Sequence, residues 1–202
     1  MNNAVFFDIM NMSYHILEVF MLVLIGPSAS GKTESAKIMI NRYPISRVVT
    51  CTTRPKRINE IDGFDYHFFS VDEFKQLENQ GYFIETAEYN NHLYGTPKNE
   101  LADDKFIILE PQGLKSFIKI NPCPIVAIYL KTDESVRIAR MKERMDKSKD
   151  INKRILSDRN DFNLEQIDGL DLIIDTSNIS LSDLADMIYN KYVEILKQKK
   201  GE

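Results

Sequence analysis

The stretch MLVLIGPSASGKT, residues 21–33, decides the fold of this chain. MLVLI (21–25) is a continuous apolar run, typical of a strand buried on both faces of a parallel sheet. It leads directly into GPSASGKT (26–33), which satisfies the pattern G-x-x-x-x-G-K-[ST]. Residues 31–43 then have the composition of a helix. A chance glycine-rich turn is the alternative, but the order strand, loop, helix favours a phosphate-binding loop.

This loop predicts binding of a nucleoside triphosphate. Glycines at both ends let backbone N–H groups turn inward around phosphates, and the following helix presents its positive N-terminus there. Lys32 is expected to bridge the β- and γ-phosphates, and Thr33 to coordinate Mg²⁺. The predicted nucleotide-binding residues are Gly26, Pro27, Ser28, Ala29, Ser30, Gly31, Lys32 and Thr33.

The rest of the chain alternates between short apolar runs and helical stretches. Further strands are predicted at RVVT (47–50), KFIIL (105–109), PIVAIYL (124–130) and DLIID (171–175). Helical stretches are predicted at 113–119, 133–146, 150–164 and 181–198. Strands that alternate with helices predict a mostly parallel sheet covered by helices on both faces.

Residues 51–96 break this alternation. FDYHFFS (64–70), YFIETAEY (82–89) and HLYG (92–95) resemble strands of a small mixed sheet, and VDEFKQLENQ (71–80) resembles a helix. Gly81 follows this helix as a natural C-terminal stop. We therefore expect a small α/β insertion that rises from the core sheet.

Length and composition limit the class of protein. The 202 residues fit one domain of ordinary size, with 43% hydrophobic and 28% charged residues. A net charge of −4 argues against a dedicated nucleic-acid binder. The two cysteines, Cys51 and Cys123, have no metal-ligand spacing and favour a reduced, cytoplasmic setting.

The first twenty residues contain no Lys or Arg, so they lack the basic region of a signal peptide. The longest apolar run, VFMLVLI (19–25), is too short to cross a bilayer. We expect Met21 to be the natural start and residues 1–20 to be an extension whose role the sequence does not assign. The alternative is a short amphipathic helix packed on the core.

CTTRPKR (51–57) packs three cations around one proline. It could be a solvated turn, a nucleic-acid patch or a grip for a second phosphate. Arg54 and Arg57 carry forked guanidinium donors that suit phosphate geometry better than lysine does. Pro55 restricts the chain between them, and Lys56 is expected to point into solvent.

The surrounding sequence resembles the acceptor region of guanylate kinases. TTRPKRINEIDGFDYHFFSVDEF (52–74) and FIETAEYNNHLYGTPK (83–98) contain T-T-R-x-x-R, D-G-x-D-Y-x-F, F-[IL]-E and Y-G-[ST] in order. With the phosphate loop, the resemblance covers residues 21 to about 115 and is looser beyond. It implies ATP-dependent phosphorylation of GMP or dGMP by direct in-line transfer.

The resemblance also implies an architecture, the phosphate-loop nucleoside-monophosphate-kinase fold. A parallel five-stranded core sheet would be flanked by helices, with an inserted acceptor subdomain and a short helical lid. On this basis the core comprises 21–51, 97–139 and 155–202, the GMP-binding insertion 52–96, and the lid 140–154.

The resemblance assigns the guanine base to Glu85 and Thr96, with Thr50 as a helper. A carboxylate can accept from guanine N1–H and the 2-amino group, and a hydroxyl can donate to O6. Adenine would leave Glu85 unpaired, a mismatch that discriminates strongly. An exposed strand carboxylate is the alternative for Glu85. The implied GMP-binding residues are Thr50, Arg54, Arg57, Tyr66, Glu85, Tyr94, Gly95, Thr96 and Glu110.

One departure concerns the acids of the family pattern D-x-D, which precede a Q-G pair. The sequence here is IILEPQG (107–113), so Glu110 is the second acid and Ile108 stands at the first when Gln112 and Gly113 are aligned. A one-residue deletion would instead put Glu110 at the first position, and only one acid survives in either alignment. Glu110 could hold a Mg²⁺-bound water or reach the acceptor nucleoside. Glu60 matches a family acid near the transferred phosphate and could take a metal-bound water in its place.

Residues 131–162 are rich in arginine, as is the lid region of the family. A merely solvated face is the alternative for such helices. Arg144 and Arg154 fall near the positions of catalytic arginines, Arg140 near the ATP site, and Arg159 is a spare. The lid lacks the family's glycine-bearing tip. The implied catalytic residues are Lys32, Arg54, Arg57, Arg144 and Arg154.

Two other functions remain open at the level of sequence. One is a related phosphate-loop kinase that acts on a ribose bisphosphate or another nucleotide. The other is a guanylate-kinase-like interaction module that has lost catalysis, although such modules typically degrade the phosphate loop. The expected partners are small nucleotides only, with no nucleic acid or membrane, and the expected state is a monomer or homodimer.

Overall fold

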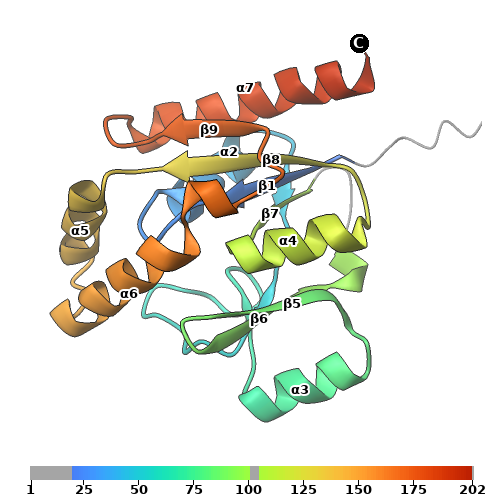
Figure 1. Cartoon of the computed structure of the whole chain (residues 1–202), viewed down its shortest axis with the longest axis vertical. Helices are drawn as coiled ribbons and strands as arrows, with labels where there is room; N and C mark the ends of the chain where they lie inside the picture. Colours follow the sequence, from blue (N-terminus) through green and yellow to red (C-terminus); the bar gives the residue numbers. More distant parts are fainter. Residues whose placement is uncertain (1–19, 101–104, 202) are drawn as a thin grey trace, which may run out of the picture.

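The computed structural model describes residues 20–100 and 105–201. The expectations for residues 1–19, including the amphipathic helix, lie outside the described residues. Two sheets organise the described chain, one of five strands and one of four. Figure 1 shows the larger sheet sandwiched between helices in the upper part of the molecule, with the smaller sheet below it.

The larger sheet is entirely parallel, as predicted. Its strand order is β2-β7-β1-β8-β9. The strands are β1 (Met21–Ile25), β2 (Ser46–Arg47), β7 (Lys105–Ile108), β8 (Ile125–Lys131) and β9 (Leu172–Asp175). All five residues of β1 are buried at the centre of this sheet. The carboxyl end of a central strand is where parallel sheets bind ligands, so the phosphate loop begins at the expected edge.

Helices cover both faces of this sheet because successive residues of β1 point to opposite sides. Leu22 and Leu24 pack on one side against α2 (Lys32–Arg42) and α7 (Leu181–Lys200). Met21, Val23 and Ile25 pack on the other side against α4 (Pro111–Ile120). Two more helices, α5 (Glu134–Glu143) and α6 (Ser148–Asp161), form the separate arm at the left of Figure 1.

The smaller sheet is mixed and has the order β4-β3-β6-β5. Its strands are β3 (Cys51–Thr52), β4 (His67–Phe68), β5 (Phe83–Tyr89) and β6 (His92–Pro97), and its helix is α3 (Val71–Asn79). The strand expected over 64–70 is only two residues long, and β3 was not predicted as a separate strand. Phe74, Phe83 and Cys51 form its own small core.

The elements that shape the site are therefore held by an apolar core on each face of the larger sheet, by the core of the smaller sheet, and by a fourth cluster within the helical arm. Short 3₁₀ turns, η1 (Lys98–Glu100) and η2 (Leu164–Gln166), complete the described elements. Gly81 ends α3 with a φ of 67°, in agreement with its predicted role as a helix stop. Within residues 20–100 and 105–201, no helix combines the length and apolarity needed to cross a membrane.

Candidate active site

The phosphate loop joins β1 to α2 in a conformation that only glycine fits at its start. Gly26 has a φ of 153°, and a Cβ there would lie 2.6 Å from the carbonyl oxygen of Leu130. The Lys32 amine donates to the carbonyl oxygens of Gly26 and, at 3.0 Å, of Pro27. Burial lowers the pKa of this amine. Lys32 is thus held over the loop, where an incoming phosphate can take up its donors.

A cleft of about 410 Å³ lies over this loop. It is lined from three directions: the phosphate loop, the arginine segment of the insertion, and the helical arm. The predicted residues that line it are Ser28, Ala29, Ser30, Gly31, Lys32, Thr33, Arg54, Arg57, Tyr66, Tyr94, Glu110, Arg140, Arg144 and Arg154. Residues distant in sequence therefore meet at one cleft, whereas the predicted residues Gly26 and Pro27 are not among those that line it.

The two arginines of CTTRPKR line this cleft, and both contact the same carboxylate, that of Glu60. Arg54 Nη2 donates to Glu60 Oε1 at 2.7 Å, and Arg57 Nη1 lies 3.5 Å from the same oxygen. The Arg57 backbone N–H donates to the other carboxylate oxygen at 2.8 Å. Lys56 is exposed, as expected. Both arginines engage Glu60. Its geometry therefore favours a role in positioning them rather than the role as holder of a metal-bound water that was considered from the sequence.

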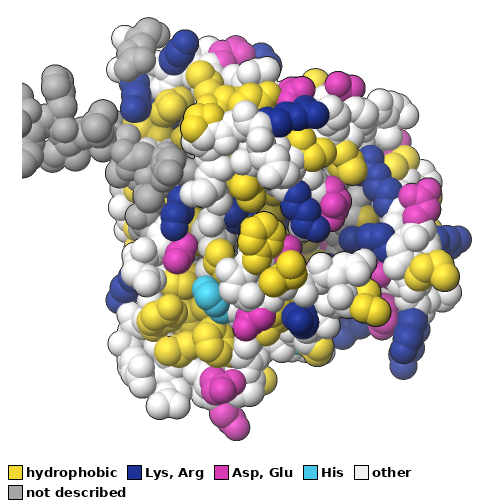
Figure 2. Space-filling model, turned by 180° about the vertical axis from the view of Figure 1, so that it is seen from behind, with side chains coloured by type: hydrophobic (Ala, Val, Ile, Leu, Met, Phe, Trp, Pro, Cys, Tyr) yellow, Lys and Arg dark blue, Asp and Glu magenta, His cyan; other side chains and the backbone are white. Residues whose placement is uncertain are grey.

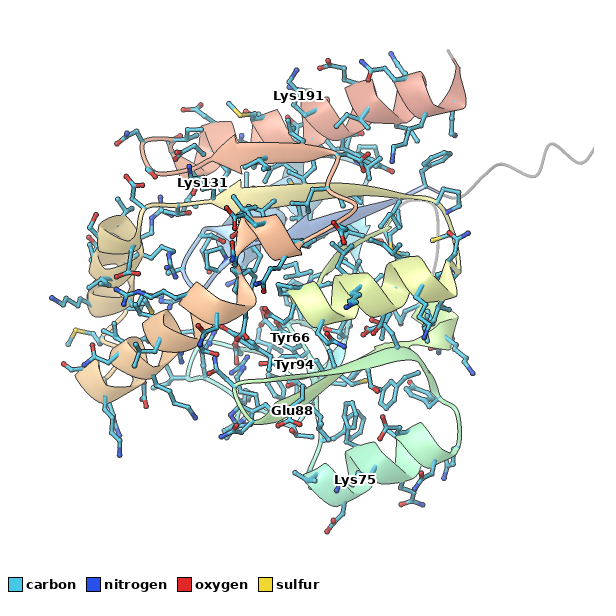
Figure 3. The ribbon with its side chains drawn as sticks, in the orientation of Figure 1. Tyr66, Lys75, Glu88, Tyr94, Lys131 and Lys191 are labelled. Atoms are coloured by element: carbon cyan, nitrogen blue, oxygen red, sulfur yellow. The ribbon has the colours of Figure 1, made fainter. Side chains whose placement is uncertain are left out.

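A narrow extension of the cleft, of about 20 Å³, leads to the predicted base residues. Figure 3 shows Tyr66 and Tyr94 in the space between the core and the mixed sheet, and their rings lie 6.2 Å apart. Both tyrosines line the cleft and its extension. The extension is lined by Thr50, Tyr66, Glu85, Ala87, Tyr94, Gly95, Ile108, Leu109, Glu110 and Gly113.

Glu85 is a buried carboxyl group in this extension, with 6% of the residue exposed. The Thr96 hydroxyl donates to its Oε1 at 2.5 Å. Its Oε2 has no hydrogen-bond partner within the described part of the chain. Burial raises the pKa of Glu85 to about 7, and the Thr96 bond opposes this shift. Thr96 therefore orients Glu85 and leaves one oxygen for a ligand.

Two glycines, one predicted and one missed, give this extension its shape. A Cβ at Gly95 would lie 2.8 Å from the Phe83 ring, so only glycine fits beside that ring. A Cβ at Gly113 would lie 3.4 Å from Glu85 Oε2, in the space a base edge would enter. Gly113 was noted only as an alignment marker, because its role depends on a contact between α4 and β5.

Glu110 lies between the two ends of the cleft, at the N-cap of α4. Burial raises its pKa to about 7, and the nearby Lys32 charge opposes that shift. Its Oε2 also lacks a hydrogen-bond partner among the described residues. Ile108, which replaces the first family acid in one alignment, lines both parts of the cleft as an apolar wall.

The helical arm supplies the remaining arginines. Arg140 donates to the carbonyl oxygens of Ala29 at 3.1 Å and Thr176 at 2.9 Å. Arg144 and Arg154 share Asp146, at 3.0 and 2.8 Å. All three arginines line the cleft. The spare Arg159 instead pairs with Glu134 on the exposed face, at 2.6 Å.

Three residues beside the phosphate loop have no functional role predicted from the sequence. Arg137 and Asp158 form a buried ion pair, and Tyr89 donates to Asp158 at 2.5 Å. Arg137 lay within the arginine-rich stretch and Tyr89 within the acceptor motif, but neither stood out. No sequence signal identifies Asp158, because its partners lie on three other elements.

Comparison with known proteins agrees with this geometry. A family model described as guanylate kinase matches residues 19–191. The chain belongs to the guanylate kinase family. The guanylate kinase of Mycoplasma genitalium is 30% identical over 183 residues, which cover 85% of this chain and 75% of that protein. The guanylate kinase of Lactobacillus acidophilus is 30% identical over 199 residues, covering 86% and 96%.

A solved guanylate kinase shares the fold. The crystal structure of guanylate kinase from Anaplasma phagocytophilum has a TM-score of 0.66 and 23% identity, and the match covers 87% of this chain and 85% of that one. The predicted resemblance to the guanylate kinase family and the predicted fold class are therefore confirmed. The roles of the individual residues remain predictions from geometry.

Proposed function

We propose that this member of the guanylate kinase family transfers the γ-phosphoryl group of ATP to GMP or dGMP, yielding ADP and GDP or dGDP. Family membership supports a kinase with GMP as acceptor and ATP as co-substrate. The observation that carries the proposal is one continuous cleft. It has a phosphate loop at one end and, at the other, a buried carboxyl group with a free oxygen.

The protein's main contribution to the reaction is positioning. Arg54 and Arg57 hold the acceptor monophosphate opposite the phosphate loop, and Tyr66 and Tyr94 add hydroxyl donors without charge. The acceptor oxygen is already anionic, so no strong general base is needed and transfer is direct and in line. Arg144 and Arg154 approach from the arm and balance the charge of the moving phosphoryl group.

Binding of the base depends on Glu85 in its ionised form. The carboxylate accepts from N1–H and the 2-amino group of guanine, and Thr96 and Thr50 lie beside it. The pKa of Glu85 is about 7 in the empty site, so guanine meets an acid that is partly protonated near neutrality. The two guanine donors then favour the ionised form.

The residues present also fit a magnesium ion with the ATP phosphates. Thr33 and Glu110 both line the cleft beside Lys32, and the free Oε2 of Glu110 suits a metal-bound water. Mg²⁺ would neutralise phosphate charge and orient the triphosphate when bound. Glu60 is the weaker candidate because both arginines engage it.

The wider setting follows the same proposal. We expect small nucleotides as the only ligands, a cytoplasmic location, and a monomer or homodimer. Figure 2 shows Lys and Arg side chains interspersed with Asp and Glu on one face, without a single continuous basic patch. This distribution and the net charge of −4 support the absence of a nucleic-acid partner.

An acceptor screen with coupled detection of ADP tests the proposed reaction. GMP and dGMP should support turnover, and AMP, CMP, UMP and ribose bisphosphate should support far less. Fast turnover with another acceptor would replace the proposal by a related kinase. A lack of thermal stabilisation by ATP and GMP would instead favour a binding module without catalysis.

A further inference from the structure

A polar cluster built around a buried ion pair lies at the first half of the phosphate loop, and the reaction proposed above leaves most of it unexplained. We call Ser28, Tyr89, Arg137 and Asp158 the Asp158 cluster. Its members come from four parts of the fold: the loop after β1, strand β5, helix α5 and helix α6. The Asp158 side chain is fully buried, and that of Arg137 is 6% exposed. Such a buried ion pair stays satisfied only with well-placed partners.

Asp158 holds the first half of the phosphate loop through both of its oxygens. Oδ2 accepts from the Ser28 backbone N–H at 3.0 Å and from Arg137 at 2.5 Å. Oδ1 accepts from the Ser28 hydroxyl at 3.2 Å. Arg137 also donates to the Ser28 carbonyl oxygen at 3.3 Å. The N–H, the carbonyl and the hydroxyl of Ser28 are thus all fixed by one ion pair.

Tyr89 connects this cluster to the base site along β5. Alternate residues of a strand share a face, so Glu85, Ala87 and Tyr89 point the same way. Glu85 and Ala87 line the base extension, and Tyr89 lines the main cleft. The Tyr89 hydroxyl donates to Asp158 Oδ1 at 2.5 Å, and its ring meets Phe162 edge-on at 6.0 Å. One strand therefore touches the base site with one end and the phosphate loop, through Asp158, with the other.

We propose that the hydrogen bond between Tyr89 and Asp158 couples the two nucleotide sites, with both as positioning residues. The inference rests on the proposed function, because it requires GMP in the base extension and ATP on the loop. Figure 1 shows β5 and β6 running beneath α4 toward α6, across the junction between insertion and core. A guanine that draws in Glu85 moves β5, and Tyr89 transmits the shift to Asp158 and Ser28. By linkage, ATP then tightens GMP binding by the same factor.

The test measures the coupling by calorimetry. The Kd of a non-hydrolysable ATP analogue with Mg²⁺ is determined without GMP and with saturating GMP, for the wild type and for Tyr89→Phe. We expect a ratio of about fivefold or more in the wild type, within the usual range of coupled sites. In Tyr89→Phe the ratio should fall to within about twofold of one. Each ratio is taken within one variant, so a changed baseline affinity cancels.

Two further variants separate coupling from simple loss of a buried hydroxyl. Tyr192→Phe is the matched control. Tyr192 lies on α7, and its hydroxyl donates to the Phe20 carbonyl oxygen at 2.7 Å. It should keep the wild-type ratio even though it loses a buried bond. Asp158→Asn retains the shape but loses the charge of the ion pair with Arg137, so it should lower the ratio and weaken analogue binding without GMP. Thermal unfolding checks that each variant is folded.

The outcomes distinguish this inference from the proposed function. A wild-type ratio near one, or an unchanged ratio in Tyr89→Phe, overturns the coupling. If the wild type nevertheless binds GMP alone and turns it over, only the coupling fails. If the wild type does not bind GMP in a direct titration, the proposed function fails and the coupling fails with it.

Discussion

Glu85 shows how one residue can combine recognition and a cost in stability. Its carboxyl group is buried beside Thr96 and faces a narrow space with one unpaired oxygen. A buried acid without a full set of donors destabilises the empty protein, since burial disfavours its charged form. In the base site proposed above, guanine provides the two missing donors. The same feature that weakens the empty site therefore favours the correct base.

Glu85→Ala should remove most of the preference for guanine. Two hydrogen bonds to a charged acceptor are lost, so kcat/KM for GMP should fall about a hundredfold or more relative to AMP, whereas the Kd for ATP should stay within about twofold. Glu88→Ala is the matched control, on the same strand but exposed, as Figure 3 shows. Unchanged GMP turnover in Glu85→Ala would disprove the assignment of the base site.

The raised pKa of Glu85 also predicts a change in stability with pH. The folded protein holds this proton up to a pKa of about 7, but the unfolded chain releases it near the ordinary glutamate pKa of 4.5. Unfolding therefore releases a proton between these values, and stability is lost as pH rises through them. Glu85→Gln lacks this loss. Its free energy of unfolding, relative to that of the wild type, should therefore rise by on the order of 3 kcal/mol between pH 4.5 and pH 8.

Urea unfolding of the ligand-free protein at several pH values measures this difference. Glu110 has a similar pKa of about 7, so its contribution is present in both proteins and cancels in the comparison. If the curve of stability against pH for Glu85→Gln is parallel to that of the wild type, the carboxyl group is not held protonated by burial.

At the scale of elements, the sequence predicted what depends on local patterns. Apolar runs identified four of the five core strands, and a glycine motif between a strand and a helix placed Lys32 and Thr33. The run predicted at 47–50 overlaps β2 (Ser46–Arg47) only at Arg47. Strand β3, an inner strand of the smaller sheet, is not predicted because its two residues, Cys51 and Thr52, carry no alternation of their own. Asp158 was missed because its partners come from β5, α5 and the phosphate loop, and no spacing along the chain encodes that meeting.

The turn between α5 and α6 illustrates a different limit. The family's glycine is absent from this lid, yet Met145 adopts a φ of 62°, the left-handed conformation that glycine favours. Its side chain is 88% exposed, so packing does not explain the residue. The backbone bond from the Met145 N–H to Lys142, at 2.9 Å, closes the turn. The geometry of the turn is retained without the residue that usually marks it.

Substitutions at Met145 should therefore depend on backbone preference alone. Met145→Asn should leave stability within about 0.5 kcal/mol of wild type, because asparagine tolerates the left-handed region. Met145→Val should be less stable than Met145→Asn by about 1 kcal/mol, because a β-branched side chain is strained there. Urea unfolding of both variants measures this difference. Equal stabilities would show that the turn relaxes to another conformation.

At the scale of the whole molecule, positive charge converges from two bodies on one space. Arg54 and Arg57 belong to the insertion, and Arg144 and Arg154 to the helical arm. Partial desolvation lowers the pKa of Arg57, and the charges of Arg54 and Arg154 lower it further. Without an anion these groups repel one another, which favours an open cleft. We expect a bound phosphate to remove that repulsion and to favour closure of the insertion and the arm around the substrate.

Sulfate should therefore stabilise the empty protein through this cleft. The measured quantity is the rise in Tm when chloride is replaced by sulfate at equal ionic strength. This rise should be about 3 °C larger for the wild type than for Arg57→Gln. Sulfate also stabilises proteins in general, so the comparison must be made between variants. Arg159→Gln is the matched control, because Arg159 pairs with Glu134 on the exposed face. It should gain as much as the wild type, and an equal gain in Arg57→Gln would show that the arginines do not form a joint anion site.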